Sequence, residues 1–187
     1  MKRYIVTGAP GSGKTSVLQM LEFQGFKVVH EAVTEIMRNN QKNGMDAPWQ
    51  ESFFLQQILD LQKTRLAKDE KSVHGVEFHD RSVLDTYILG IYLQQDCPKM
   101  LEAEIRSILQ TGIYETRVFF FESLESYQTT PERRMSREEA HLFGLLHEKV
   151  FLEFQFQLIK VPPMQVSQRV EFIKNCVSEF ESYLVRM

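Results

Sequence analysis

The sequence holds 187 residues, of which 25 are acidic and 22 basic, so its formal net charge is −3. Hydrophobic residues make up 43% of the chain, enough to bury a substantial core, which excludes an intrinsically disordered protein. The charge balance excludes a broadly basic surface for nucleic acid, and no apolar run approaches the length of a membrane span.

The length favours a single domain covering residues 1–187. Cys97 and Cys176 lie far apart and share no metal-ligand spacing, so we expect a reduced intracellular protein without a disulfide framework. The opening MKRYIVTGAPGSGK has too short an apolar run for a signal peptide. We therefore expect a cytoplasmic protein.

Strand-like and helix-like segments alternate along the chain. Short β-rich runs predict five strands, at Arg3–Thr7, Phe26–His30, Val73–Phe78, Arg117–Phe121 and Phe156–Val161. Apolar residues at helical spacing predict helices between them, at Ser16–Phe23, Ala32–Asn39, from Asp46–Pro48 to about Lys68, along Leu84, Ile88 and Ile91, over Lys99–Leu109, along Phe143, Leu146 and Val150, and from Val166 to Leu184.

This alternation predicts an α/β fold, a three-layer sandwich of about five parallel strands with helices on both faces. No repeat, low-complexity tract or linker divides it. In such sheets ligands bind at the carboxyl ends of the strands.

The stretch GAPGSGKT, residues 8–15, matches G-x-x-x-x-G-K-[ST] in full and lies between the first strand and the first helix. Its glycines allow backbone N–H groups to converge on an anion at the positive end of the helix. Lys14 can reach the β- and γ-phosphates, and the Thr15 hydroxyl can bind Mg²⁺. This phosphate loop predicts a P-loop NTPase fold that binds ATP and Mg²⁺, with the nucleotide held by Gly8, Ala9, Pro10, Gly11, Ser12, Gly13, Lys14, Thr15 and Ser16.

Two acidic residues follow neighbouring strands. Glu31 comes directly after FKVVH, and Asp80 lies just past the third strand in VEFHDRS. In a parallel sheet both stand at the same edge as the phosphate loop, where one acid can hold Mg²⁺ and another can deprotonate an attacking hydroxyl. The alternative is that both acids serve helix starts, where negative charge is favourable.

The polar stretch TTPERRMSREEAH places three arginines between the fourth strand and the next helix. Arginines on a lid, at about residues 123–140, can close over the triphosphate and stabilise the charge that develops during transfer. The alternative is a solvated helix start, because three glutamates accompany the arginines, which are Arg133, Arg134 and Arg137.

The segments GAPGSGKT, HEAVTEIMR, HDRSVLDTYI, PERRMSREEA and VPPMQVSQRVEFI together resemble the NadR-like AAA domain family. That family includes the kinase portion of bacterial nicotinamide riboside kinases. A more distant similarity links the chain to deoxynucleoside and thymidylate kinases.

The resemblance implies a role for each matching residue. It makes Glu31 the candidate base, gives Asp80 and Arg81 the task of organising metal and phosphates, and makes Arg133, Arg134 and Arg137 the lid. It also places the segment around Pro162 to Val166 beside the nucleotide base, and Gln57 toward the acceptor.

Two functions compete. The first is a kinase that moves the γ-phosphoryl group of ATP to a hydroxyl of a small nucleoside- or metabolite-type acceptor. The second is a nucleotide-dependent switch or ATPase that acts through a protein partner. Arg81 directly after Asp80, and the lack of an N-K-x-D segment, favour the kinase. No histidine set suits a metal, we expect neither nucleic acid nor membrane as a partner, and a homodimer stays open.

Overall fold

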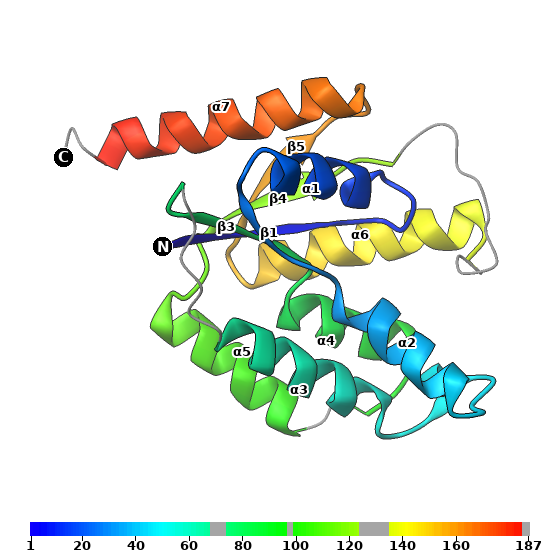
Figure 1. Ribbon diagram of the computed structural model, residues 1–187. Helices are drawn as coiled ribbons and strands as arrows, with labels where there is room; N and C mark the ends of the chain where they lie inside the picture. Colours follow the sequence, from blue (N-terminus) through cyan, green and yellow to red (C-terminus); the bar gives the residue numbers. More distant parts are fainter. Residues whose placement is uncertain (68–73, 97–98, 124–134, 185–187) are drawn as a thin grey trace.

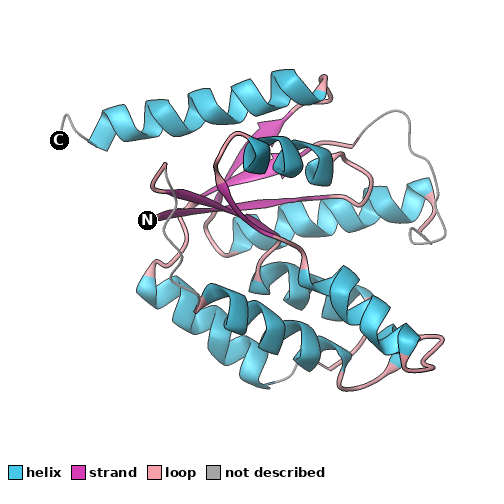
Figure 2. Ribbon diagram, in the orientation of Figure 1, coloured by secondary structure: helices cyan, strands magenta, loops and turns pink. Residues whose placement is uncertain are grey.

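The computed structural model describes residues 1–67, 74–96, 99–123 and 135–184. Its centre is a parallel five-stranded sheet with the strand order β2-β3-β1-β4-β5 (Figure 2). The strands are β1 (Lys2–Gly8), β2 (Lys27–Val29), β3 (Val76–Asp80), β4 (Arg117–Phe121) and β5 (Gln157–Val161).

Helices cover both faces of the sheet (Figure 1). One face carries α1 (Lys14–Phe23) and α7 (Val166–Leu184), which contact each other. The other face carries α4 (Val83–Tyr92), α5 (Lys99–Thr111) and α6 (Arg137–Glu153), with α2 (Ala32–Lys42), the short 3₁₀ helix η1 (Pro48–Gln50) and α3 (Phe54–Leu66) packed beyond α4. The predicted three-layer α/β fold is confirmed.

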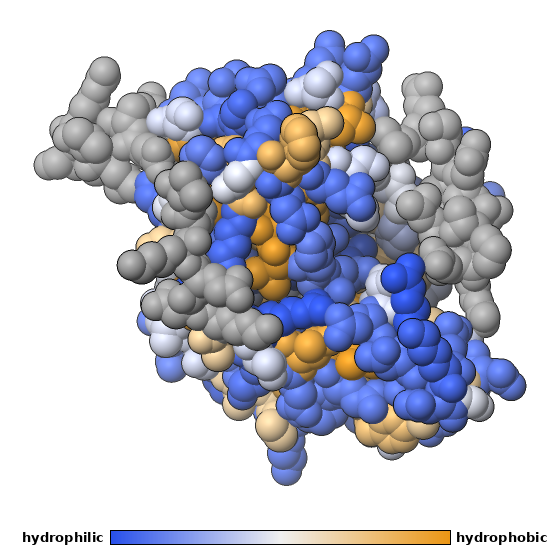
Figure 3. Space-filling model, viewed as in Figure 1, coloured by the Kyte–Doolittle hydropathy of each residue, from blue (hydrophilic) through white to orange (hydrophobic). Residues whose placement is uncertain are grey.

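Side chains that alternate along the strands build the two cores. Tyr4 and Val6 of β1 pack with α1 and α7, whereas Ile5 between them packs with the helices of the opposite face. Successive side chains of a strand point to opposite faces, so each buried strand contributes to both layers. Figure 3 shows hydrophilic residues over most of the visible face, with hydrophobic ones in separate patches.

The predicted boundaries of β3 and α3 were wrong. Strand β3 runs to Asp80 rather than stopping at Phe78, because His79 and Asp80 pair with Ile5 and Val6 of β1. Pairing with a neighbour thus overrides the low strand propensity of polar residues. Helix α3 begins at Phe54, not near Pro48, because η1 and an extended Glu51 precede it.

Ile91 was also expected on the buried stripe of α4, but its side chain is 42% exposed. Leu84 and Ile88 of that stripe are fully buried. Ile91 lies in the last turn of α4, beyond the part that packs on the core.

The parallel order brings the carboxyl ends of β1, β2 and β3 to one edge of the sheet. The phosphate loop, Glu31 and Asp80 therefore start from the same edge. Across the described parts of the chain, every helix is too short or too polar to cross a membrane.

Candidate nucleotide-binding site

The phosphate loop requires glycine where it leaves the sheet. Gly8, the last residue of β1, has a φ of 127°, and a Cβ atom built there would lie 2.4 Å from the carbonyl oxygen of Phe121 on β4. Gly13, at the N-cap of α1, has a φ of 85° in the left-handed region. Because this N-cap residue is glycine, it offers no side chain to the first N–H groups of α1, a helix end that suits an anion.

Lys14 is folded back onto the phosphate loop. Its Nζ donates to the carbonyl oxygens of Gly8 at 3.1 Å and Ala9 at 2.9 Å, and to the Ser12 hydroxyl at 3.2 Å. The side chain is 7% exposed. Burial, followed by the positive charge of Arg81, lowers the pKa of Lys14 to about 7. All three of these hydrogen-bond acceptors are neutral, and bound phosphates would place negative charge directly beside the ammonium group.

Asp80 is a buried carboxylate without a hydrogen-bond donor among the described residues. It is 8% exposed, and burial together with the negative charge of Glu31 raises its pKa to about 6. Such a carboxylate suits a cation, and the exposed Thr15 hydroxyl lies in the first turn of α1. Mg²⁺ typically binds one or two protein oxygens and completes its shell with water and phosphate, so these two residues fit Mg²⁺.

Arg81 joins the acidic groups to the phosphate loop. Its φ of 72° is rare for a residue with a side chain, and its backbone N–H still donates to Val6 at 3.0 Å. Its Nε donates to Glu31 at 2.8 Å, and Nη2 donates to the carbonyl oxygen of Gly8 at 3.3 Å. The guanidinium group is thereby held between the candidate base and the first residue of the loop.

Sequence reasoning missed the other two partners of Arg81, which are Asp85 and His147. Arg81 Nη1 lies 3.2 Å from Asp85 Oδ1 and 3.0 Å from His147 Nε2. His147 Nδ1 donates to its own helix at Phe143 O, 2.8 Å away, which leaves Nε2 free to accept from Arg81. His147 comes from α6, 66 residues away in the sequence, and no local signal points to it.

Asp85 had a readable signal, because Ser82 and Asp85 form a capping box at the start of α4. Its Oδ2 accepts from the Ser82 N–H at 2.7 Å, while Oδ1 accepts from the Thr7 hydroxyl on β1. Burial alone would raise the pKa of Asp85, but the positive charge of Arg81 and the hydrogen bond from the Thr7 hydroxyl bring it well below its usual range.

Glu31 occupies the N-cap position of α2, as the helix-start alternative expected, although its side chain makes no capping hydrogen bond. Its carboxylate binds Arg81 and also accepts from the Thr34 hydroxyl at 2.6 Å. Asp80 does not cap a helix, because Ser82 is the N-cap residue of α4. That helix-start alternative was therefore wrong for Asp80.

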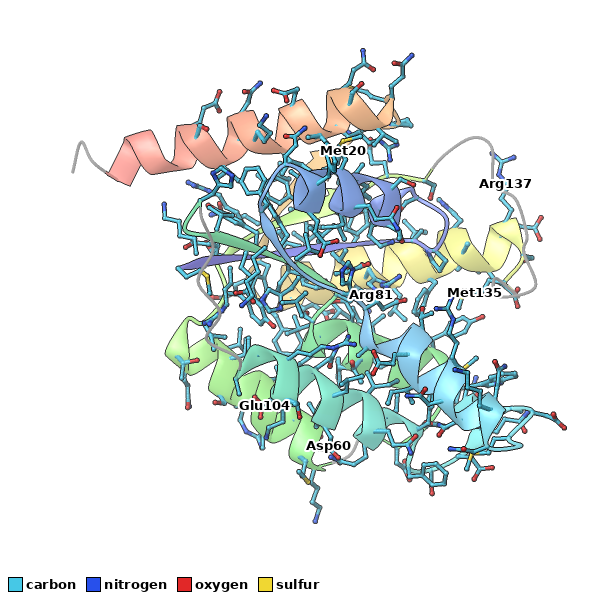
Figure 4. The ribbon with its side chains drawn as sticks, viewed as in Figure 1. Met20, Asp60, Arg81, Glu104, Met135 and Arg137 are labelled. Atoms are coloured by element: carbon cyan, nitrogen blue, oxygen red, sulfur yellow. The ribbon has the colours of Figure 1, made fainter. Side chains whose placement is uncertain are left out.

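Of the lid arginines, Arg133 and Arg134 lie outside the described residues. Arg137 is the first residue of α6 and is exposed. Figure 4 shows it at the outer end of that helix, apart from the central Arg81. Gln57 accepts a hydrogen bond from Asn40 at 2.7 Å, which links α3 to α2.

A parallel sheet whose first strand runs into a phosphate loop, with acids at the same edge, defines the class of P-loop nucleotide-binding proteins. This chain belongs to a family of AAA domains, whose model matches residues 3–169. The predicted family is thus confirmed. No curated protein sequence is significantly similar to the chain.

Solved structures share the fold. Deoxyadenosine kinase from M. mycoides with products dCMP and dCDP superimposes with a TM-score of 0.60 at 12% identity, covering 95% of this chain and 99% of that one. The same enzyme with bound dCTP gives 0.61 at 16% identity, covering 96% and 100%. NadR protein in complex with NR gives 0.60 at 14% identity, covering 86% of this chain and 43% of that one.

Proposed function

We propose that the protein is a Mg²⁺-dependent kinase that transfers the γ-phosphoryl group of ATP to a hydroxyl group of a nucleoside-type or related small metabolite. One observation carries the proposal: the Asp80 carboxylate, buried and without a hydrogen-bond partner among the described residues, lies beside the Arg81–Glu31 ion pair at the sheet edge that holds the phosphate loop. Residues suited to bind an anion, to bind a cation and to act as a general base therefore start from the same sheet edge.

Each residue has a role in this reaction. Lys14 and the N–H groups of the loop neutralise the β- and γ-phosphates, while Thr15 and Asp80 would hold Mg²⁺. The ion, when bound, offsets negative charge on the phosphates. Glu31 accepts the proton of the acceptor hydroxyl, whose oxygen bonds to the γ-phosphorus as the bond to ADP breaks.

Arg81 keeps the Glu31 carboxylate oriented and ties it to the loop carbonyl of Gly8. Glu31 keeps lone pairs for an acceptor hydroxyl, because each carboxylate oxygen can accept more than one hydrogen bond. Positioning and electrostatics supply most of the catalysis in phosphoryl transfer. We also propose that the chain is a single domain in which residues at about 123–140 form a lid over the triphosphate.

The comparisons support the acceptor class. A deoxyadenosine kinase and a NadR protein in complex with NR have this fold, and a further NadR structure holds NAD and AMP-PNP. We propose ATP as the donor on the same basis.

Mg²⁺-dependent release of ADP from ATP tests the proposal, measured with and without a panel of nucleosides, nicotinamide riboside and other hydroxylated metabolites. Strong stimulation by one compound is expected, together with its phosphorylated product by mass spectrometry. Lys14→Ala and Glu31→Gln should each remove the stimulation. Tight nucleotide binding with slow, acceptor-independent turnover would contradict the kinase and favour the nucleotide-dependent switch.

A further inference from the structure

Arg169 of α7 is a buried cation with few partners. Its side chain is 2% exposed, and its Nη1 donates to the carbonyl oxygen of Ser12 at 2.6 Å. The guanidinium carbon lies 5.5 Å from the ring centre of Phe121. Among the described residues, neither Nε nor Nη2 has a hydrogen-bond partner, and no carboxylate forms an ion pair with Arg169.

Such an environment does not favour the fold. A buried charge is costly unless it is paired and its hydrogen bonds are satisfied. Burial lowers the pKa of Arg169, and only the negative charge of Glu122 opposes it. Replacing poorly paired buried charges by apolar side chains of similar volume is often neutral or stabilising. Stability alone therefore does not explain an arginine at this position.

The contact with Ser12 has a direct consequence for the phosphate loop. The peptide between Ser12 and Gly13 is trans, so its carbonyl and its N–H point in opposite directions. Because Arg169 holds the carbonyl oxygen on its own side, the Gly13 N–H points the other way. Gly13 is the N-cap of α1 and directly precedes Lys14.

We propose that Arg169 is a positioning residue for polyphosphate: it fixes the orientation of the Ser12–Gly13 peptide and provides buried positive charge that the bound phosphates balance. The ligand class is a pyrophosphate group, as in ADP or free pyrophosphate. This inference rests on the nucleotide binding in the proposed function but not on any acceptor or transfer step.

Calorimetric binding of ADP and of inorganic pyrophosphate to the full chain tests the role of Arg169. Arg169→Met should weaken both ligands by about tenfold or more, and by similar factors, since a charge-assisted hydrogen bond is lost near the phosphates. Arg169→Lys should recover part of the affinity. Arg169→Gln, which keeps a donor for Ser12 but no charge, separates the hydrogen bond from the charge.

Thermal unfolding of the variants without ligand distinguishes a role of Arg169 in phosphate binding from a role in stability. We expect Arg169→Met to unfold at the wild-type temperature or above while it binds phosphates more weakly. Lys174→Met is the matched control, because Lys174 lies on the same helix and pairs with Glu171 at 2.8 Å near the surface. It should leave both affinities unchanged.

Unchanged pyrophosphate affinity in Arg169→Met would overturn the inference. If only the affinity for ADP fell, Arg169 would act on the adenosine part of the nucleotide and not on its phosphates. If Arg169→Met fails to fold, weaker binding of both ADP and pyrophosphate by Arg169→Gln than by Arg169→Lys still supports the role, and wild-type affinity in both variants refutes it. A wild-type protein that binds neither ligand would refute the proposed function itself.

Discussion

Two buried aspartates five residues apart have opposite electrostatic environments. Asp80 has no donor among the described residues, and burial followed by the Glu31 charge raises its pKa from 3.8 to about 6. Asp85 is surrounded by donors, and its pKa is held far below its ordinary value despite burial. The first environment suits a group that awaits a cation, whereas the second suits a structural carboxylate.

Asparagine at these two positions should change stability in opposite directions. Because the pKa of Asp80 is raised, its ionisation lowers the stability of the fold as pH rises from 3.8 through about 6. Asp80→Asn should therefore stabilise the protein without ligand at neutral pH by about 1–3 kcal/mol. Asp85, whose pKa is lowered, stabilises the fold above its unfolded pKa and loses this effect in acid. Asp85→Asn should destabilise by about 2–4 kcal/mol.

Urea unfolding near neutral pH without Mg²⁺ or nucleotide measures both variants. Asp80→Asn should also lose Mg²⁺-dependent turnover while it remains folded. A destabilised Asp80→Asn, or one with unchanged turnover, would remove Asp80 from the proposed metal site.

Lys14 should make nucleotide affinity depend on pH. Burial and the Arg81 charge lower its pKa to about 7 in the free protein, and bound phosphates favour the charged form and raise it again. Binding therefore takes up a proton, and ADP affinity should fall by up to about tenfold per pH unit from about pH 7.5 to about pH 9.

Calorimetry in buffers of different ionisation enthalpy counts the proton taken up with Lys14. The phosphates of ADP titrate near about pH 6, so they stay ionised throughout this range. Lys14→Met removes the titrating group and should bind weakly with a flat pH profile. A wild-type profile that is equally flat would contradict a lowered Lys14 pKa.

At the scale of elements, α6 connects the phosphate loop to the region proposed as the lid. Gly144 lies against Ala9, where a Cβ atom would come within 3.2 Å of the Ala9 Cβ. One turn further on, His147 accepts from Arg81. Helix α6, which begins at Arg137, is thus packed against the phosphate loop and contacts Arg81, the partner of the candidate base Glu31.

Gly144→Val should push α6 away from the phosphate loop. Overpacking a tight contact costs about 1–3 kcal/mol of stability, and ADP should bind more weakly because the loop shifts. Leu145→Val is the matched control, since Leu145 is adjacent, 49% exposed and placed in the same helix. Denaturant unfolding and ADP titration of both variants check the contact, and wild-type stability and ADP affinity in Gly144→Val would contradict it.

At the scale of the whole molecule, ligand binding should stabilise the fold. The loop lies between β1 and α1, Asp80 ends β3, and Arg169 reaches the loop from α7, so bound nucleotide would tie the sheet to the layer formed by α1 and α7. ADP with Mg²⁺ at one hundred times its Kd should add about 2.7 kcal/mol, or roughly 5–10 °C in Tm for a chain of this length.

Scanning calorimetry at several ligand concentrations measures this shift. The wild-type Tm should rise with the logarithm of ADP concentration, whereas Lys14→Ala should show no rise over the same range. A wild-type Tm that does not respond would contradict nucleotide binding at the loop.

Local patterns were sufficient for the order of elements and for the phosphate loop. β-rich runs, apolar residues at helical spacing and the G-x-x-x-x-G-K-[ST] motif each occupy a short stretch of the chain. The five parallel strands and the P-loop fold could therefore be predicted. The ends of elements were less predictable. β3 extends to Asp80 because β1 pairs with it, which is a contact between residues more than seventy positions apart.

The sequence by itself determined the α/β fold and the residues available for phosphate, and it indicated the acids after β2 and β3. Only the tertiary structure decided that Arg81 binds Glu31, Asp85 and His147 together, and that Arg169 holds the carbonyl of Ser12. The reason is physical: a local pattern reflects backbone periodicity and turn geometry, whereas these contacts depend on how helices far apart in the chain pack on one sheet edge.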